Sequence, residues 1–410
     1  MAALEKYLPR CRIFLLDGAK FRTNLFALFF DLPLKRETAT KTALLAEVLK
    51  RTDFSETAKQ AEELYGALWD VSVVKKGDRQ LLLFSLETLQ AVDGEDALSF
   101  LRERVLGPLK AGAFGEKEVE RQKDILKQKL ESLQDDKKAF ARRRALEETA
   151  EGTDYALSGD GYGEDLEEIS PKSLFLYYRD MVEEAEVKVF FCGDKKEKQK
   201  IMALRQDFPG KVPFAKKEEQ EGAKNGPRFI QENAKMEQAR LLLGFSADVE
   251  SSRRQAALLV LNHLLGASPD SLLFQRLREE EGLCYDVKSY LSPLSPYFFV
   301  QAGIQAARAK EAGKLVLQCV EELKKEGVSE EKLAQAKENI LRDYDGLADN
   351  PWAMVDFFAE RALQGKEMTT EPFLGRIEKV EAEDIMRAAA HLELKTIYLL
   401  SGKEEDHGEN

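Results

Sequence analysis

The sequence repeats itself at an interval of about 215 residues, and this repeat limits the possible folds more than any other feature. In the first copy, an apolar extended segment at 24–31 is followed by a helical pattern at 39–51. In the second copy, a similar extended segment at 239–246 is followed by a helical pattern at 253–265. A chain with such a repeat is expected to contain the same structural unit twice.

The register of the repeat is kept further along the chain. The six residues from Gly66 to Val71 reappear in similar form from Gly282 to Val287. Each copy leads into an alternating, aromatic-rich run that is typical of a strand, at 81–87 and at 297–304. Each half then closes with a helix, a short strand and a glycine. Matches in the same order at several places predict two similar halves.

The pattern of strands and helices predicts the α+β class. Each half is expected to hold an antiparallel-rich sheet covered by helices on one side, with the two halves facing each other across a cleft. Long amphipathic helices are predicted, for example at 116–146 and 311–326. A stretch rich in Lys, Glu, Gly and Pro predicts a linker at 209–227 between domains at 1–208 and 228–410.

The composition excludes several classes of partner. A net charge of −12 argues against a nucleic-acid role, and the basic run Arg142 to Arg144, followed by Glu147 and Glu148, is expected to be a solvated helix face. No apolar run approaches the roughly 20 residues of a membrane helix, and the first residues lack the apolar core of a signal peptide. We therefore expect neither nucleic acid nor membrane as a partner, and a cytoplasmic location.

The cysteines and histidines do not form a local metal motif. The four cysteines, which have no C-x-x-C spacing, are expected to be small buried hydrophobes. They are Cys11, Cys192, Cys284 and Cys319. His263, His391 and His407 lack the three- or four-residue spacing of a helical metal site.

The segment from Leu272 to Val287, taken with the two similar halves and the short helix after the first strand, resembles the insulinase/pitrilysin metallopeptidase family. That family includes the mitochondrial processing peptidases and paired bacterial relatives, and the resemblance covers essentially the whole chain. The segments 64–68 and 75–77 are similar to the zinc-less member of inactive and active bacterial pairs.

The resemblance implies that this chain has no zinc site. Active members carry the inverted motif His-x-x-Glu-His on the first helix, with a further glutamate on a later helix. The resemblance places Leu44 and Val48 at the histidine positions, Glu47 at the general-base position and Lys129 at the third ligand. We therefore expect no cofactor in this chain, with Glu47 as a remnant, or as a plain helix-surface carboxylate. His263 is expected to be a packed or capped residue.

A second set of family residues is retained in the carboxy-terminal half. Family members grip substrate with an arginine and a tyrosine seven positions apart, and Arg278 and Tyr285 match that pattern, with Gly282 suited to end the helix between them. The alternative is that Arg278 forms a surface ion pair and Tyr285 is a half-buried strand aromatic. Only Glu281, at i+3, is placed to pair with Arg278 along the helix.

These residues together predict a non-catalytic subunit that binds extended peptide for a zinc-bearing homologous partner. The zinc would then be in the partner, and the isolated chain could form a homodimer. One alternative is a structural or peptide-binding scaffold without a proteolytic role. Another is an independent enzyme with a relocated metal site, which Glu47 alone would suggest.

Overall fold

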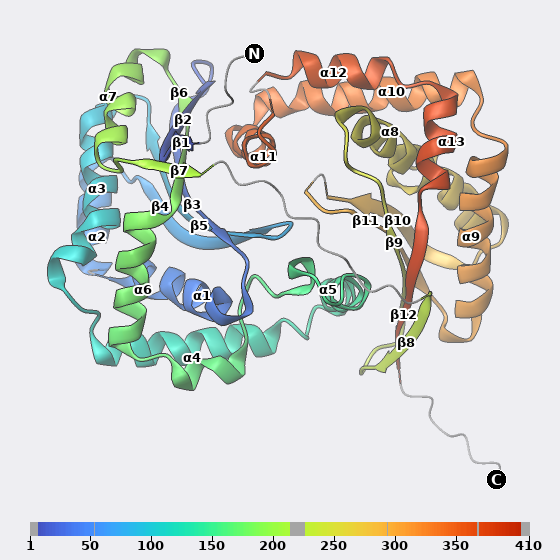
Figure 1. The fold of residues 1–410 in the computed structure, drawn as a ribbon, viewed down its shortest axis with the longest axis horizontal. Coiled ribbons are helices and arrows are strands. Elements are labelled where there is room, and N and C mark those ends of the chain that lie inside the picture. Colours follow the sequence, from blue (N-terminus) through green and yellow to red (C-terminus); the bar gives the residue numbers. More distant parts are fainter. Residues whose placement is uncertain (1–6, 53, 214–225, 293, 367–368, 403–410) are drawn as a thin grey trace, which may run out of the picture. The chain divides into compact units, whose positions relative to one another are not determined.

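The structure is a computed structural model that describes residues 7–52, 54–213, 226–292, 294–366 and 369–402. These residues form two compact units, each built on a five-stranded sheet (Figure 1). The first unit takes its described residues from 7–132, 157–213 and 347–366. The second unit takes its described residues from 133–156, 226–346 and 369–402.

The two sheets have the same strand order. The first runs, from edge to edge, β2 (Cys11–Asp17), β6 (Glu186–Gly193), β3 (Thr23–Pro33), β5 (Arg79–Leu89) and β4 (Leu68–Lys76). The second runs β8 (Arg228–Asn233), β12 (Glu393–Ser401), β9 (Ala239–Ser246), β11 (Tyr297–Ile304) and β10 (Cys284–Leu291). In each sheet the first pair is parallel and the remaining pairs are antiparallel. The α+β class and the internal repeat are confirmed.

Helices accompany both sheets. The first unit holds α1 (Arg36–Arg51), α2 (Phe54–Glu63), α3 (Gly94–Ala111), α4 (Glu116–Ser132), α6 (Pro171–Glu184), α7 (Lys198–Met202) and α11 (Pro351–Leu363). The second holds α5 (Lys137–Thr149), α8 (Ser252–Asn262), α9 (Ala309–Lys325), α10 (Glu330–Asp345), α12 (Glu371–Glu378) and α13 (Ala382–Ala390).

Several short elements complete the fold. Two π-helical segments lie in the second unit, η5 (His263–Ala267) and η6 (Phe274–Glu280). Short 3₁₀ turns are η1 (Asp154–Ala156), η2 (Gly163–Glu168), η3 (Lys195–Glu197), η4 (Ala203–Gln206), η7 (Ala306–Arg308) and η8 (Gly346–Asp349). β1 (Tyr7–Pro9) and β7 (Lys211–Pro213) form an antiparallel ribbon. β7 lies in the predicted linker, of which residues 214–225 are outside the described residues.

Both faces of the first sheet are buried. Along β3, Phe26, Leu28 and Phe30 point into a core shared with α1, α3 and α6, whereas the alternate residues point the other way. Those alternate residues meet α11 in a second core, built from Leu25, Ala27, Phe29, Val355, Phe358 and Ala359. The prediction of helices on one side of the sheet is therefore incomplete, because a single helix covers the opposite face.

Each unit takes this covering helix from the other half of the sequence. α11 comes from the carboxy-terminal half and belongs to the first unit, and α5 comes from the amino-terminal half and belongs to the second. In the second unit, Ala141 and Ala145 of α5 pack with Leu242, Phe299 and Leu400 of the sheet. The two helices occupy equivalent places in the repeat. The contiguous domains predicted at 1–208 and 228–410 did not anticipate this exchange.

The exchange explains why the helix predicted at 116–146 is interrupted. α4 ends at Ser132 in the first unit, and α5 begins at Lys137 in the second. Asp136 starts the new helix, since its carboxylate accepts hydrogen bonds from the backbone N–H groups of Lys138 and Ala139, both at 3.0 Å.

The cysteines are free and buried, as the sequence predicts. Burial raises the pKa of the thiols of Cys11, Cys192 and Cys284 to about 11, and that of Cys319 to about 12. These thiols are therefore protonated and unreactive at neutral pH. Within the described ranges, no helix has both the length and the apolar character needed to cross a membrane.

Candidate functional site

The helix predicted from the resemblance to stand at the zinc motif is α1. Leu44 and Val48 lie one turn apart on it, with 0% and 1% of their surface exposed, and both belong to the hydrophobic core of the first unit. Their aliphatic side chains have no lone pair with which to bind a metal ion. At these two positions the helix therefore contributes to packing.

Glu47 and Lys129 lie close together although they are far apart in the sequence. The Lys129 ammonium donates a hydrogen bond to Oε1 of Glu47 at 3.1 Å, from α4 to α1. The Glu47 side chain is 20% exposed and that of Lys129 is 55% exposed. The structure thus brings the predicted general-base and third-ligand positions together, as an ion pair at the surface of the first unit.

These residues do not fit a zinc ion. Zinc in such sites is held by imidazole and carboxylate groups, whereas this chain presents two buried aliphatic side chains and an ammonium group that would repel the cation. Across the described ranges, no group of three or more His, Cys, Asp or Glu side chains could hold a metal ion. Nδ1 of His391 lies 2.7 Å from the Arg387 carbonyl, and His407 is outside the described residues.

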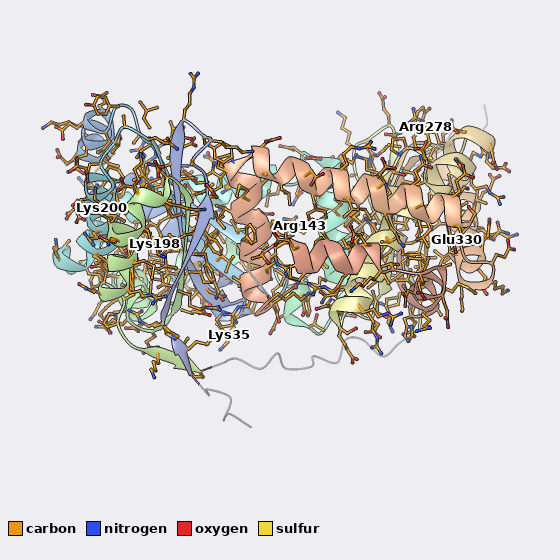
Figure 2. All side chains as sticks on the ribbon, turned by 90° about the horizontal axis from the view of Figure 1, so that it is seen from above. Lys35, Arg143, Lys198, Lys200, Arg278 and Glu330 are labelled. Carbon is orange, nitrogen blue, oxygen red and sulfur yellow. The ribbon has the colours of Figure 1, made fainter. Side chains whose placement is uncertain are left out.

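Arg278 lies on the second π-helical segment and is exposed. Its guanidinium stacks on the ring of Phe274, 4.7 Å from the ring centre, and makes no hydrogen bond or ion pair with another described residue. The neighbouring Arg276 behaves differently, since it pairs with Glu280 at 3.7 Å and with Glu322 at 3.0 Å. Figure 2 labels Arg278 among the surface side chains. The guanidinium is therefore held by a ring face while its donors stay available.

Tyr285 lies on β10, one of the two edge strands of the second sheet, and is 64% exposed. The pairing of β10 with β11 shifts between Cys284 and Asp286, so Tyr285 is the extra residue of a β-bulge. Bulges of this kind re-aim a side chain. Its hydroxyl group has no hydrogen-bond partner among the described residues. Gly282, with a φ of 56°, makes the left-handed turn between the π-helical segment and the strand.

The first π-helical segment packs closely against the same strand. A Cβ added to Gly266 would come within 2.6 Å of the backbone nitrogen of Ser289 on β10, so only glycine permits this approach. π-helical turns occur often at functional sites. The helical periodicity at 253–265 did not reveal this change of helix type.

A polar network beside Tyr285 was missed by the sequence reasoning. The carboxylate of Asp286 accepts hydrogen bonds from Arg240 at 2.6 Å and from Lys138 at 3.1 Å. Burial by itself would raise the pKa of Asp286, but the bonds from Arg240 and Lys138 outweigh it and lower the pKa. Lys138 comes from α5, so its nearness could be found only once the exchange of helices was known.

The basic run on α5 is not simply a solvated face, contrary to the prediction. Arg142 is exposed, but it donates to the buried Gln301 at 2.5 Å. Arg144 is partly buried and pairs with Glu147, Glu148 and Glu232 at 2.5, 2.8 and 2.7 Å. These groups link α5 to the second sheet.

Comparisons with known proteins agree with this geometry. A family profile described as the peptidase M16 inactive domain matches residues 168–340. The chain is 28% identical over 401 residues to the probable inactive metalloprotease YmfF of Bacillus subtilis, covering 94% of each protein. A conserved protein of Enterococcus faecalis has a crystal structure with a TM-score of 0.83 and 25% identity, over 98% of this chain and 100% of that one.

A peptidase M16 inactive domain from Pseudomonas fluorescens has the same fold, with a TM-score of 0.79 and 20% identity over 95% of this chain and 96% of that one. The fold is thus that of metallopeptidase-like proteins built from two similar halves. The chain is similar in sequence to an inactive member of the M16 peptidase family, and its residues 168–340 match the inactive-domain profile. Both the matched profile and the Bacillus relative are described as inactive, in agreement with the prediction that this chain is not catalytic on its own.

Proposed function

We propose that this chain is the non-catalytic subunit of a heterodimer in which a zinc-bearing homologue performs peptide hydrolysis. The observation that carries the proposal is the contrast between the two sets of family positions. At the zinc positions, Leu44 and Val48 are buried in the core and Lys129 neutralises Glu47. At the substrate positions, Arg278 and Tyr285 are exposed and make no hydrogen bond with any described residue.

The two side chains offer hydrogen-bond donors of a useful kind. The Arg278 guanidinium and the Tyr285 hydroxyl can donate to a peptide carbonyl and to the oxyanion that forms from it. Stacking on Phe274 limits the motion of the guanidinium, and the bulge sets the direction of the tyrosine. Loss of one such donor typically costs about 3–4 kcal/mol of transition-state stabilisation.

An extended peptide could add as a strand to a free sheet edge. β4 and β10 are each one of the two terminal strands of their sheets, and β10 carries Tyr285. Main-chain hydrogen bonds along such an edge bind a peptide with little regard to its sequence. This mode of binding supports unfolded peptide as the substrate, held by this chain and cleaved by the zinc-bearing partner.

A mixing assay tests the proposal. This chain, a zinc-bearing M16 homologue from the same organism and their mixture are each assayed with a fluorogenic unstructured peptide. We expect no hydrolysis by this chain alone and a strong rise in the mixture. Arg278→Ala and Tyr285→Phe should each lower the kcat/KM of the mixture, the first by about 100-fold.

Arg342→Ala is the matched control, because Arg342 is an exposed arginine of the same unit whose side chain pairs, among the described residues, only with Glu338 of its own helix. This control should leave the activity unchanged. If Arg278→Ala and Tyr285→Phe also keep the activity of the wild type, the assisting role is wrong. A scaffold without proteolytic role would then be supported if the chain still bound extended peptide.

A further inference from the structure

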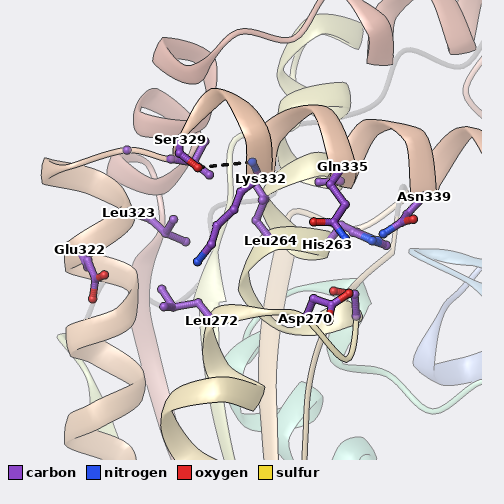
Figure 3. A pocket seen from close by; sticks show the side chains of 14 residues that line it. His263, Leu264, Asp270, Leu272, Glu322, Leu323, Ser329, Lys332, Gln335 and Asn339 are labelled. Atoms are coloured by element: carbon purple, nitrogen blue, oxygen red, sulfur yellow. Dashed lines mark hydrogen bonds between the residues drawn. The ribbon is translucent and has the colours of Figure 1, made fainter.

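A cavity of about 350 Å³ lies at the surface of the second unit, where Lys332 and Asp270 of its lining are exposed (Figure 3). Neither Arg278 nor Tyr285 lines it. Its walls come from η5 and the turn that follows, from the end of α9 and from the first turns of α10. Part of the wall is apolar and is formed by Leu264, Leu272 and Leu323. This volume is at the lower end of the range for small-molecule sites, roughly 300–1,000 Å³.

One end of the cavity carries a positive charge. Lys332 extends from α10 between Leu323 and Leu272, as Figure 3 shows, and its ammonium has no partner among the described residues. Ser329 caps α10 by accepting a hydrogen bond from the backbone N–H of Lys332 at 3.3 Å, which holds this first turn in place. Glu322 also lines the cavity, but its carboxylate is already paired with Arg276 at 3.0 Å.

The other end carries a carboxylate and neutral polar groups. Asp270 lies there with His263, Gln335 and Asn339 (Figure 3). Among the described residues, the Asp270 carboxylate has no cationic or hydrogen-bonding partner. Nε2 of His263 is buried and has no hydrogen-bond partner in the described part of the chain. A buried polar atom without a partner is costly, and a ligand in the cavity would satisfy this nitrogen.

His263 is in its neutral form near pH 7. Burial lowers the pKa of the imidazole, and the nearby Asp343 and Asp270 oppose this effect only in part. A neutral ring can donate through one nitrogen and accept through the other. The charged groups free to bind a ligand are therefore the ammonium of Lys332 at one end and the carboxylate of Asp270 at the other.

We infer that this cavity binds a small amino-acid zwitterion with an apolar side chain. Lys332 would bind the ligand carboxylate, Asp270 the ligand ammonium, and Leu264, Leu272 and Leu323 the apolar side chain. His263, Gln335 and Asn339 would complete the hydrogen bonds at the ammonium end. The inference uses none of the residues of the proposed peptide site, so either proposal can fail without the other.

Calorimetric titration of the full chain with L-leucine, N-acetyl-L-leucine and L-leucinamide tests this inference. Leucine carries both charges, and each of the other two lacks one of them. We expect leucine to bind with a Kd below about 1 mM, and each blocked form to bind about tenfold more weakly or worse. A blocked form that binds as well as leucine would contradict the assignment, as would the absence of leucine binding.

Two variants locate the site. Lys332→Met and Asp270→Asn should each weaken leucine binding by about tenfold or more. Lys332→Met should leave the weak binding of leucinamide unchanged, since that probe has no carboxylate. Lys314→Met is the matched control, because Lys314 is an exposed lysine of α9 that does not line the cavity. If Lys332→Met and Asp270→Asn bind leucine as tightly as Lys314→Met does, the ligand binds elsewhere and the inference is overturned.

Discussion

At the scale of single residues, the most consequential charges in the first unit lie under α11. The Lys188 side chain is only 2% exposed, and its ammonium binds the carboxylates of Asp31 and Glu186. Asp31 is 5% exposed and also accepts a hydrogen bond from Arg79 at 2.6 Å. Buried charges are tolerated only when they are paired, so each member of this cluster depends on the others.

Replacing Lys188 by methionine should destabilise the first unit strongly. The variant would leave two carboxylates without their shared buried cation, and we expect the free energy of unfolding to fall by about 3 kcal/mol. Denaturant unfolding checks this value. Lys195→Met is the control, since Lys195 forms an exposed ion pair with Asp17, and it should have no measurable effect. Equal stability of the two variants would mean that the cluster contributes little.

The same cluster predicts a dependence of stability on pH. Burial would raise the pKa of Asp31, but Lys188 and Arg79 outweigh it, so the pKa lies below its ordinary value of 3.8. The folded state then binds the proton less tightly than the unfolded state. The stability from this carboxylate is full above about pH 4 and is lost as the pH falls through the folded pKa.

Asp31→Asn tests this sign. The variant should be less stable than the wild type at pH 7, and the difference should shrink as the pH is lowered below about 4. Unfolding curves at pH 7 and at acid pH give both differences. A constant or growing gap at acid pH would contradict the assigned direction of the pKa shift.

The sequence predicted the positions of site residues in the fold where those positions follow from a short stretch of the chain. Leu44, Val48 and Glu47 share one helix, and Arg278, Gly282 and Tyr285 share one short segment, so their places in the fold follow from local patterns. The stacking of Arg278 on Phe274 and the bulge at Tyr285 depend on side-chain packing and strand pairing. Sequence spacing does not encode these details.

At the scale of elements, the exchanged helices are the main finding that the sequence did not predict. Helical periodicity predicted helical structure at 116–146, but it carries no information about which sheet a helix covers. α5 and α11 are each surrounded by strands that are distant in sequence. Such contacts are visible only in three dimensions.

Because α11 packs on the first sheet, a substitution in its buried face should destabilise the first unit. Phe358 is 8% exposed and packs in the core with Leu25, Ala27 and Phe29 of β3. Phe358→Ala should therefore lower the stability of the first unit by about 3 kcal/mol, although the residue belongs to the carboxy-terminal half of the sequence. Hydrogen exchange should show lost protection in β3, β5 and β6, while the second sheet stays protected.

Trp352→Ala provides the control for this experiment. Trp352 lies on the same helix but is 39% exposed, and its loss should change the protection of β3 much less. Loss of protection in β9, β11 and β12 instead of the first sheet would show that α11 belongs with the second unit.

At the scale of the whole molecule, the internal repeat explains most of what could be foreseen. Two copies of one strand order follow from the repeat at about 215 residues, and the structure confirms them. The same repeat then diverged in chemistry. In the first copy, the positions predicted for metal ligands include the buried Leu44 and Val48, whereas in the second copy Arg278 and Tyr285 are exposed. A chain of this kind can assist catalysis without performing it.

The most direct test is to titrate a zinc-bearing homologue with this chain while the initial rate of peptide hydrolysis is measured. The account predicts that the rate rises until the two chains are present in equal amounts and then stays constant. With Arg278→Ala the rate should level off at the same ratio but at a much lower value. A rate that does not respond at any ratio, or hydrolysis by this chain alone, would contradict the account.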